Sequence, residues 1–301
     1  MLYGFYHEHN RALIKMETEH TWQTADGARL RYRLIKRGGD TAVVMLHGVA
    51  SNLTRWSELV QHIQISQQWD LLRIDLRGHG RSYYRGKINH EIWVNDLVAL
   101  LQQRGYQHAI VIGHSLGAQL ALHFAHLYPH MSKGLVLIDP LFPQALQGRL
   151  AWLAKLRPLL WLIIRVVQLL NCLGVKRRCF PELDLQVLDQ QTRVRMRDNP
   201  DMDIADYYAR PFSDIKNLPL ANYLQDLYAV IQPLPVLTSI KTSALVMLSQ
   251  GVGLSDIAAT QRQLEQLSHV ETVIIDANHW MLTEKPEQTR FAIEQWCNRL
   301  V

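Results

Sequence analysis

"VIGHSLGAQLAL" (residues 111–122) joins an apolar, β-branched run to a helix-forming run through Ser115, which stands between Gly113 and Gly117. A sharp turn from strand to helix holds a serine in a strained backbone conformation and projects its hydroxyl clear of the sheet. Side chains two residues to either side would collide in such a turn, so the two glycines make room for Ser115. The stretch predicts a nucleophilic serine, and the alternative is a tight turn without chemistry.

Short apolar runs with helical patterns between them surround this turn. Runs without alternation are typical of strands that are buried on both faces of a parallel sheet. Ahead of them, residues 20–36 predict an antiparallel hairpin that turns at Asp26-Gly27. The chain is therefore predicted to have an α/β fold, with a mostly parallel central sheet flanked by helices. The predicted parallel strands are 41–48, 70–78, 108–115, 134–140, 243–251 and 270–278.

The strand series has a gap of about a hundred residues. From Leu141 to about Ile240 the sequence shows only helical patterns interrupted by prolines, and this is too long for a connecting loop. We expect a helical cap over the carboxyl ends of the strands. The predicted organisation is a core in two parts, 1–140 and 241–301, with the cap at 141–240.

Two further stretches complete the chemistry that Ser115 needs. In "MLHGVASNLTRW" (45–56) a predicted strand ends at His47-Gly48, where the amide of Val49 can form an oxyanion hole with the amide of Leu116. In "IIDANHWMLTEKPEQ" (274–288), His279 follows the last strand and precedes the terminal helix. An exposed loop histidine is the alternative for His279, but its order and position favour the general base.

The chain resembles the α/β-hydrolase superfamily, in particular its capped, lipase- or esterase-like members. The resemblance runs from residue 41 to 287 and leaves the insertion unmatched. It implies Ser115 as nucleophile, His279 as base, and the amides of Val49 and Leu116 as oxyanion donors. The matching motifs are "LHGVA" (46–50), "DLRGHGRS" (75–82), "GHSLG" (113–117), "LVLIDP" (135–140) and "NHWMLTEKPE" (278–287).

The acid of the triad departs from the family pattern. Where the family has its aspartate after the 243–251 strand, this chain has Leu254, and Asp256 lies two residues further on. We expect Asp256 to be the acid, with Asp139 at the end of the preceding strand as the alternative. The family also has glycine before the histidine, where Asn278 stands here; asparagine tolerates unusual backbone angles.

Composition and charge exclude several other functions. No zinc-finger or RNA-binding pattern accompanies the net charge of +5, so no nucleic-acid partner is expected. His123, His126 and His130 share a helical face without a carboxylate, and neither a metal nor a cofactor is expected. Three cysteines without metal-binding spacing and the lack of a signal-peptide pattern predict a cytoplasmic protein.

The basic residues concentrate in one apolar part of the predicted cap. Residues 149–178 contain seven bases and no acid, so the charge of this segment exceeds the net charge of +5 of the whole chain. Pro158 and Arg165 interrupt its apolar run. One interpretation is a buried pair of cap helices whose cations are neutralised by residues 182–240, which hold nine acids and five bases. The other is an interfacial lid that contacts the membrane surface peripherally. Both predict a substrate with an apolar part.

Together these features predict a serine hydrolase that cleaves carboxylic esters with a hydrophobic acyl group through an acyl-enzyme on Ser115. A thioesterase or a lactonase would use the same residues with a different leaving group. A ligand-binding protein on a hydrolase scaffold is the alternative outside enzymes.

Overall fold

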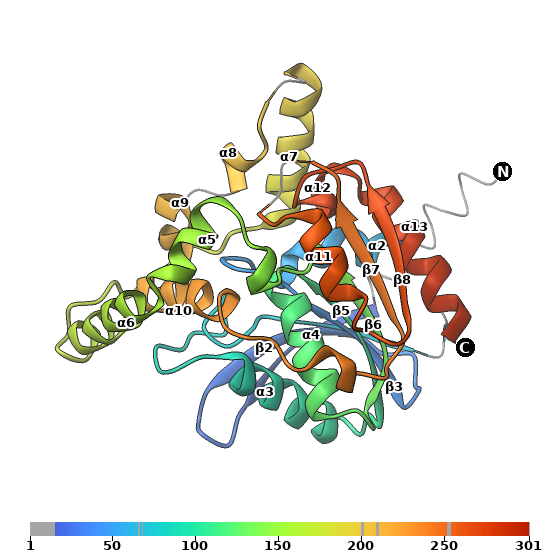
Figure 1. Ribbon diagram of the computed structural model, residues 1–301. Coiled ribbons are helices and arrows are strands. Elements are labelled where there is room, and N and C mark those ends of the chain that lie inside the picture. The colour runs from blue at the N-terminus through green and yellow to red at the C-terminus, as the bar shows by residue number, and fades with distance from the viewer. Residues whose placement is uncertain are drawn as a thin grey trace.

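The computed structural model describes residues 16–300 except 66, 68, 200–201, 209–210 and 252–253. Eight strands of the described chain form one sheet in the order β1-β2-β4-β3-β5-β6-β7-β8 (Figure 1). The N-terminal stretch 1–15, on which the expectation of no signal peptide rests, lies outside the described residues.

The predicted strands are all present. β1 (Glu17–Gln23) and β2 (Arg29–Ile35) form the antiparallel hairpin around Asp26-Gly27, and β2 pairs antiparallel with β4. The remaining pairs are parallel, as the apolar runs indicated. The other strands are β3 (Thr41–Leu46), β4 (Asp70–Ile74), β5 (His108–His114), β6 (Ser132–Ile138), β7 (Ala244–Ser249) and β8 (Val270–Ile275).

Helices cover both faces of the sheet because alternate strand residues point to opposite sides. On β5, Val111 belongs to the core under α3 (His90–Gln103), α4 (Leu116–Leu127) and α11 (Ile257–Leu264). Its neighbours Ile110 and Ile112 belong to the core under α2 (Ser57–His62) and α13 (Pro286–Cys297), on the other face. Two hydrophobic cores thus hold the parallel strands and fix where their carboxyl ends lie.

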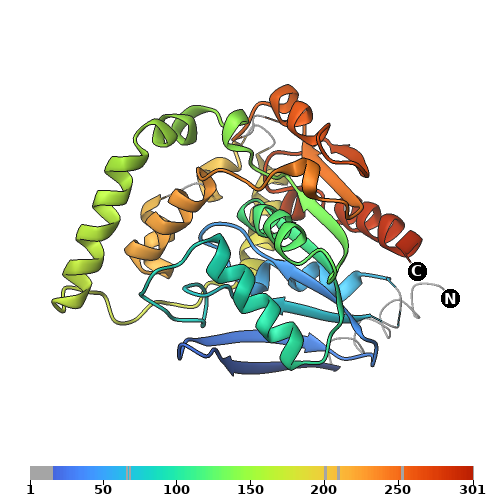
Figure 2. The same cartoon turned by 60° about the horizontal axis from the view of Figure 1, so that its bottom comes forward.

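Between β6 and β7 the described chain forms helices only, and these make up the segment that we propose as the cap. The elements are α5 (Gly148–Lys155), α6 (Arg157–Cys172), α7 (Leu185–Asp198), α8 (Ala205–Tyr208), α9 (Pro211–Asn217) and α10 (Leu220–Val230). In Figure 2, α6 (yellow-green) lies farthest from the sheet, whereas α10 packs on α4. No helix among the described residues is long and apolar enough to cross a membrane.

Buried polar contacts tie α10 to the loop after β4. The Asn222 side chain donates to the carbonyls of Gly78 and Tyr84, and the side chain of Asp226 lies 2.7 Å from Nε2 of His79. Nearby, Glu182 of the cap pairs with Arg31 and Arg81. His79 and Arg81, in the motif "DLRGHGRS", thus hold the loop and the cap together.

Candidate active site

Ser115 lies at the junction of β5 and α4, in a backbone conformation that most residues avoid. Its φ is 56° and its ψ is −114°, and its amide donates to the carbonyl of Ile138 at 2.9 Å. A Cβ at Gly113 would lie 2.2 Å from the carbonyl oxygen of Gly117, and one at Gly117 would lie 2.1 Å from that of Leu46. The two glycines are therefore required by close backbone contacts on both sides of the turn, as the sequence predicted.

The loop after β3 lies directly against Ser115. A Cβ at Gly48 would be 3.2 Å from the Cβ of Ser115, so the residue preceding Val49 touches the turn of Ser115. His47 is fully buried and clamps this loop: its Nδ1–H donates to the Gly48 carbonyl at 2.9 Å, and its Nε2 accepts from the amide of Leu76 at 3.1 Å. Burial keeps the pKa of His47 well below its usual value, so this clamp is neutral.

His279 follows β8 and precedes α12 (Met281–Glu284), and it lies against Asp139. Nδ1 of His279 is 2.5 Å from Oδ2 of Asp139, and both side chains are buried. A carboxylate can only accept, so the proton of this hydrogen bond is on Nδ1, and Nε2 is the ring nitrogen that faces away from Asp139. A neutral imidazole with its proton on Nδ1 is suited to accept a proton from a hydroxyl.

His114, the residue before Ser115, holds the loop of His279. Its Nε2–H donates to the carbonyl of His279 at 2.9 Å, and the two rings are 4.9 Å apart between centroids. Burial, reinforced by the nearby charge of His279, lowers the pKa of His114 to about 3, so this contact stays neutral. The contact places the histidine loop beside the turn of Ser115.

Asp139, at the end of β6, uses both of its carboxylate oxygens. Oδ2 faces His279, and Oδ1 accepts from the amide and the hydroxyl of Ser249 at 2.9 and 3.0 Å. Burial opposes ionisation, but the hydrogen bond and charge of His279 and the two donors of Ser249 outweigh it and lower the pKa of Asp139. The carboxylate is therefore ionised and oriented before any substrate arrives.

The structure does not bring Asp256 to His279, contrary to our expectation for these two residues. Asp256 is the N-cap of α11 and accepts from the amide of Ala259 at 2.5 Å. Its loop is drawn toward the start of the cap, because the amide of Asp256 donates to Ala145 and the amide of Gln147 donates to Leu254. Backbone pairing with residues 145–147 therefore fixes where Asp256 lies, and a count of residues after β7 does not include this pairing.

Asn278 stands in place of the family's glycine without an unusual backbone angle. Among the described residues, the non-glycine residues with positive φ are Ala50, Ser115 and Asp139, so Asn278 does not adopt such an angle. Its amide and side chain instead donate to the carboxylate of Glu284, at 3.0 to 3.1 Å. The three strained residues follow β3, β5 and β6, so the strain gathers where the site lies.

A buried cluster around Arg55 was not found from the sequence. One guanidinium nitrogen of Arg55 lies 2.6 Å from Asp189 of α7 and 2.9 Å from the hydroxyl of Thr283 in α12. Tyr208 donates to the same Asp189 carboxylate at 2.5 Å, and its ring stands 5.5 Å from that of Trp280. Arg55 lies in a short 3₁₀ helix, η1 (Leu53–Trp56), which is too short to give a periodic signal, and its partners lie more than a hundred residues away.

The histidines on α4 make contacts of other kinds. His123 stacks on His90 with ring centroids 4.4 Å apart, and Nδ1 of His126 lies 2.7 Å from the hydroxyl of Ser239. Within the part of the chain that the structure describes, no group of three or more His, Cys, Asp or Glu side chains is arranged to hold a metal ion.

Comparison with known proteins agrees with this architecture. A putative esterase/lipase from Haemophilus influenzae is 28% identical over 110 residues, which are 36% of this chain and 38% of that protein. Lipase LipV from Mycobacterium tuberculosis is 34% identical over 102 residues, 34% of this chain and 38% of its own length. The chain thus matches well under half of the length of these curated relatives.

A solved structure extends the similarity of fold to nearly the whole chain. A thermophilic esterase from Thermogutta terrifontis superimposes with a TM-score of 0.66 at 19% identity, over 94% of this chain and 98% of that one. Residues 39–286 match the family described as serine aminopeptidase, S33. The strained serine between β5 and α4, the parallel sheet and this match lead to one conclusion: the chain belongs to that family, within the α/β-hydrolase superfamily.

Proposed function

We propose that this protein is a serine hydrolase that cleaves carboxylic esters with an apolar acyl group. The observation that carries the proposal is the buried pair of Asp139 and His279, joined at 2.5 Å and held by His114 beside the strained turn of Ser115. Ser115, His279 and Asp139 are the residue types that acyl transfer requires as nucleophile, base and acid.

In the proposed reaction, Oγ of Ser115 attacks the ester carbonyl carbon while Nε2 of His279 takes the hydroxyl proton. The amides of Val49 and Leu116 donate to the oxyanion that forms. The tetrahedral intermediate collapses, the C–O bond to the alcohol breaks, and His279 returns the proton to the leaving alkoxide. Water then attacks the acyl-enzyme with His279 as base, which releases the acid and restores Ser115.

Asp139 supplies orientation and charge in this scheme. The carboxylate holds Nδ1–H, so Nε2 faces away from it, with its lone pair available when the ring is neutral. When His279 becomes positively charged, the ionised carboxylate stabilises the imidazolium. Ser249 keeps the second oxygen in place, so Asp139 cannot rotate away from His279.

The preference for an apolar acyl group is supported by the surroundings of these residues. Trp280 stands edge-on to His279, with ring centroids 5.5 Å apart. The ring of Tyr208 packs on the other ring of this pair, Trp280, also at 5.5 Å. Val49 packs against the hydrophobic core that also includes Leu160 and Ile164 of α6. We propose a cytoplasmic location, since Cys172, Cys179 and Cys297 are free thiols.

A fluorophosphonate probe tests the nucleophile directly, because it reacts with an activated serine and forms a stable adduct. We expect rapid labelling of the natural protein at Ser115 and none of Ser115→Ala. p-Nitrophenyl esters of increasing acyl length, acyl-CoA thioesters, lactones and aminoacyl anilides then define the substrate. Faster turnover of thioesters or lactones than of esters would make the protein a thioesterase or a lactonase. A protein that is neither labelled nor active would favour a binding function.

A further inference from the structure

The outer side of α6 exposes an apolar surface that the fold does not use. Seven large apolar side chains on this helix and at its C-cap are 41% to 71% exposed, whereas Leu160 and Ile164 on its inner side are buried. We call the seven the α6 face. They are Leu159, Leu162, Ile163, Val166, Leu169, Leu170 and Leu173.

The α6 face is one continuous stripe. Its members recur every three or four residues from Leu159 to Leu173, which places them along one side of a helix. A surface helix ordinarily buries its apolar stripe against the core. In α6 the stripe is exposed instead, and the polar side chains of Gln168 and Asn171 are half-buried on the inner side. A contiguous exposed apolar surface of this kind marks an interaction site.

Cations and tryptophans surround the α6 face. Residues 149–178 hold seven bases and no acid, and none of these bases lies within 4.0 Å of a described carboxylate. Trp152 is 64% exposed and Trp161 is 51% exposed, with Arg165 over the Trp161 ring at 5.9 Å. The bases are Arg149, Lys155, Arg157, Arg165, Lys176, Arg177 and Arg178.

Three acids of the second half of the cap pair with residues outside α6, and no described acid lies within 4.0 Å of the seven bases, so the ion pairs that the buried-cap interpretation required do not form among the described residues. Glu182 pairs with Arg31 and Arg81, Asp189 pairs with Arg55, and Asp226 pairs with His79. The positive charge around α6 is left for a partner outside the chain.

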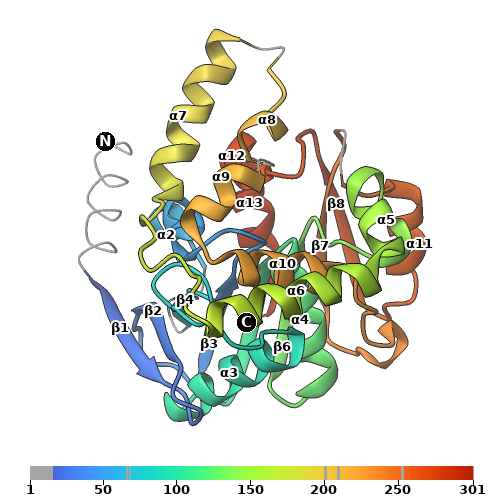
Figure 3. The same ribbon diagram turned by 90° about the vertical axis from the view of Figure 1, so that its left-hand side faces the viewer.

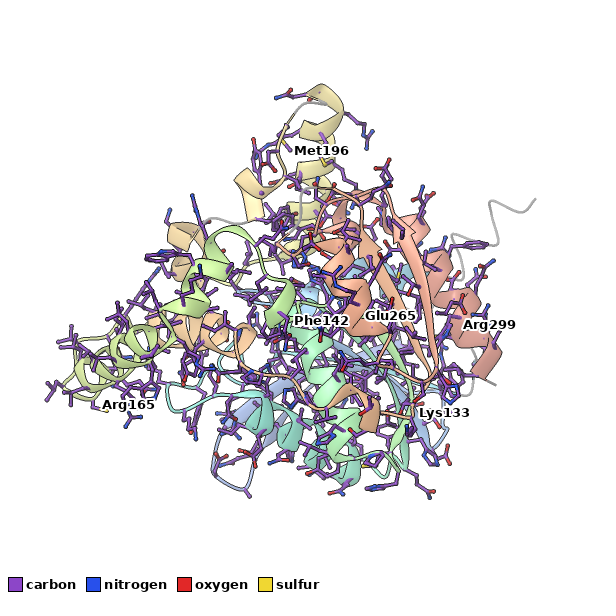
Figure 4. All side chains as sticks on the ribbon, viewed as in Figure 1. Lys133, Phe142, Arg165, Met196, Glu265 and Arg299 are labelled. Carbon is purple, nitrogen blue, oxygen red and sulfur yellow. The ribbon has the colours of Figure 1, made fainter. Side chains whose placement is uncertain are left out.

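The α6 face lies on the outermost side of the molecule. Figure 3 shows α6 crossing in front of α10, and in Figure 1 α6 and β8 lie at opposite sides of the molecule. Figure 4 places Arg165 at the outer edge of the molecule. α6 packs on α10, which Asn222 and Asp226 fix to the loop after β4. A surface bound at α6 would therefore hold the catalytic core in a defined orientation.

We propose that the α6 face binds the surface of an anionic phospholipid bilayer, with α6 lying flat at the interface. Apolar side chains enter the acyl region, and the tryptophans and cations contact the headgroups, where both are favourable. α6 has 16 residues with Arg165 at its middle, whereas a membrane-spanning helix needs about 20 apolar residues. The helix therefore suits an orientation parallel to the membrane surface. A second copy of the chain fits less well, because a two-fold contact would bring the seven bases of each copy together.

Cosedimentation with vesicles tests the proposal. At about 20 mM salt the natural protein should bind vesicles with roughly 30% phosphatidylglycerol and leave those of pure phosphatidylcholine in solution. Salt of about 500 mM should release most of it, because screening shortens the reach of the cations to a few ångströms. Tryptophan fluorescence should shift to shorter wavelength on binding.

Matched variants identify the surface. The triple variant Leu162→Ser, Val166→Ser, Leu169→Ser should lower the vesicle partition coefficient at least tenfold, as should Lys176→Gln, Arg177→Gln, Arg178→Gln. The apolar control is Val236→Ser, Ile274→Ser, Phe291→Ser, three side chains that are 51% to 67% exposed elsewhere. The charge control is Arg29→Gln, Lys241→Gln, Arg262→Gln. All four variants should keep turnover of a soluble ester, so loss of binding is separable from loss of function.

Three results would overturn the proposal. The first is no binding to anionic vesicles at low salt. The second is equal loss of binding in the control variants. The third is a dimer of the natural protein, seen by light scattering, that the α6 triple variant dissociates, which would make the face a contact between copies.

Discussion

Nδ1 of His279 lies 2.5 Å from Oδ2 of Asp139, while Asp256 caps a helix instead. If the acid acts through this contact, Asp139→Asn should lower turnover about 10⁴-fold, because the amide supplies neither the charge nor the correct tautomer. Asp256→Asn keeps a capping side chain and should change turnover by less than about threefold. The turnover numbers of the two variants are compared by steady-state kinetics on one ester. Circular dichroism checks that both variants are folded. The opposite ranking would return the role to Asp256.

The hydroxyl of Ser115 should be essential for chemistry and dispensable for folding. Ser115→Ala removes one atom at the turn, so we expect turnover to fall by about 10³-fold or more. The urea midpoint should stay close to that of the natural protein. A variant that kept a tenth of the activity would contradict the acyl-enzyme mechanism.

Gly113 and Gly117, on either side of the turn of Ser115, should not tolerate substitution by alanine. In Gly117→Ala the new Cβ would lie 2.1 Å from the Leu46 carbonyl oxygen, so backbone must move and both stability and activity should fall. Gly105→Ala is the control: its φ is +80°, and the new Cβ would have no neighbour within 4 Å. That change should cost about 1–2 kcal/mol of unfolding free energy without loss of turnover per folded molecule. Equal effects of the two variants in urea unfolding would contradict the close contact.

The stability of the contact between the proposed cap and the loop of His279 should depend on the buried pair of Arg55 and Asp189. Asp189→Leu leaves the guanidinium buried without its carboxylate and should cost about 3–5 kcal/mol of stability. Turnover should also fall, because Arg55 donates to Thr283, four residues after His279. The double variant Arg55→Met, Asp189→Leu removes both charges and should recover much of the stability in urea unfolding. Failure to recover would show that the hydrogen bonds of Arg55 matter more than its charge.

The stacked pair of His90 and His123 should make the fold sensitive to mild acid. Burial lowers the pKa of His90 to about 4 and that of His123 to about 3, with the charge of His90 also lowering the latter. The unfolded chain binds protons below about pH 6.5, while the folded pair stays neutral. Each histidine should therefore reduce the unfolding free energy by up to about 1.4 kcal/mol per pH unit as the pH falls from 6.5 toward 4.

A single substitution tests this dependence. Nε2 of His123 is buried without a hydrogen-bond partner in the described structure, so His123→Phe keeps the stacked ring and removes a titrating group. Urea midpoints at several pH values should show a shallower decline for this variant. The exposed His130→Phe should leave the decline unchanged. Equal slopes for all three proteins would exclude the pair as the cause.

The sequence by itself determined the strands, the turn at Ser115 and the order of the motifs, because these depend on local patterns. Apolar runs of fixed length predict buried strands, and the Gly113 and Gly117 requirement follows from the shape of one turn. The position of His279 after the last strand was equally local. These parts of the fold agree with the structure over the described residues.

Only the tertiary structure decided which aspartate meets His279. Asp139 and Asp256 follow neighbouring strands, and backbone pairing of residues 145–147 with 254–256 draws the second one away. The same holds for Arg55, whose partners come from distant helices, and for α6, whose apolar stripe is as compatible with burial as with exposure. Contacts between segments far apart in the chain carry no local pattern, and so the Asp139–His279 contact, the buried ion pair and the outward face could be seen only once the chain was folded.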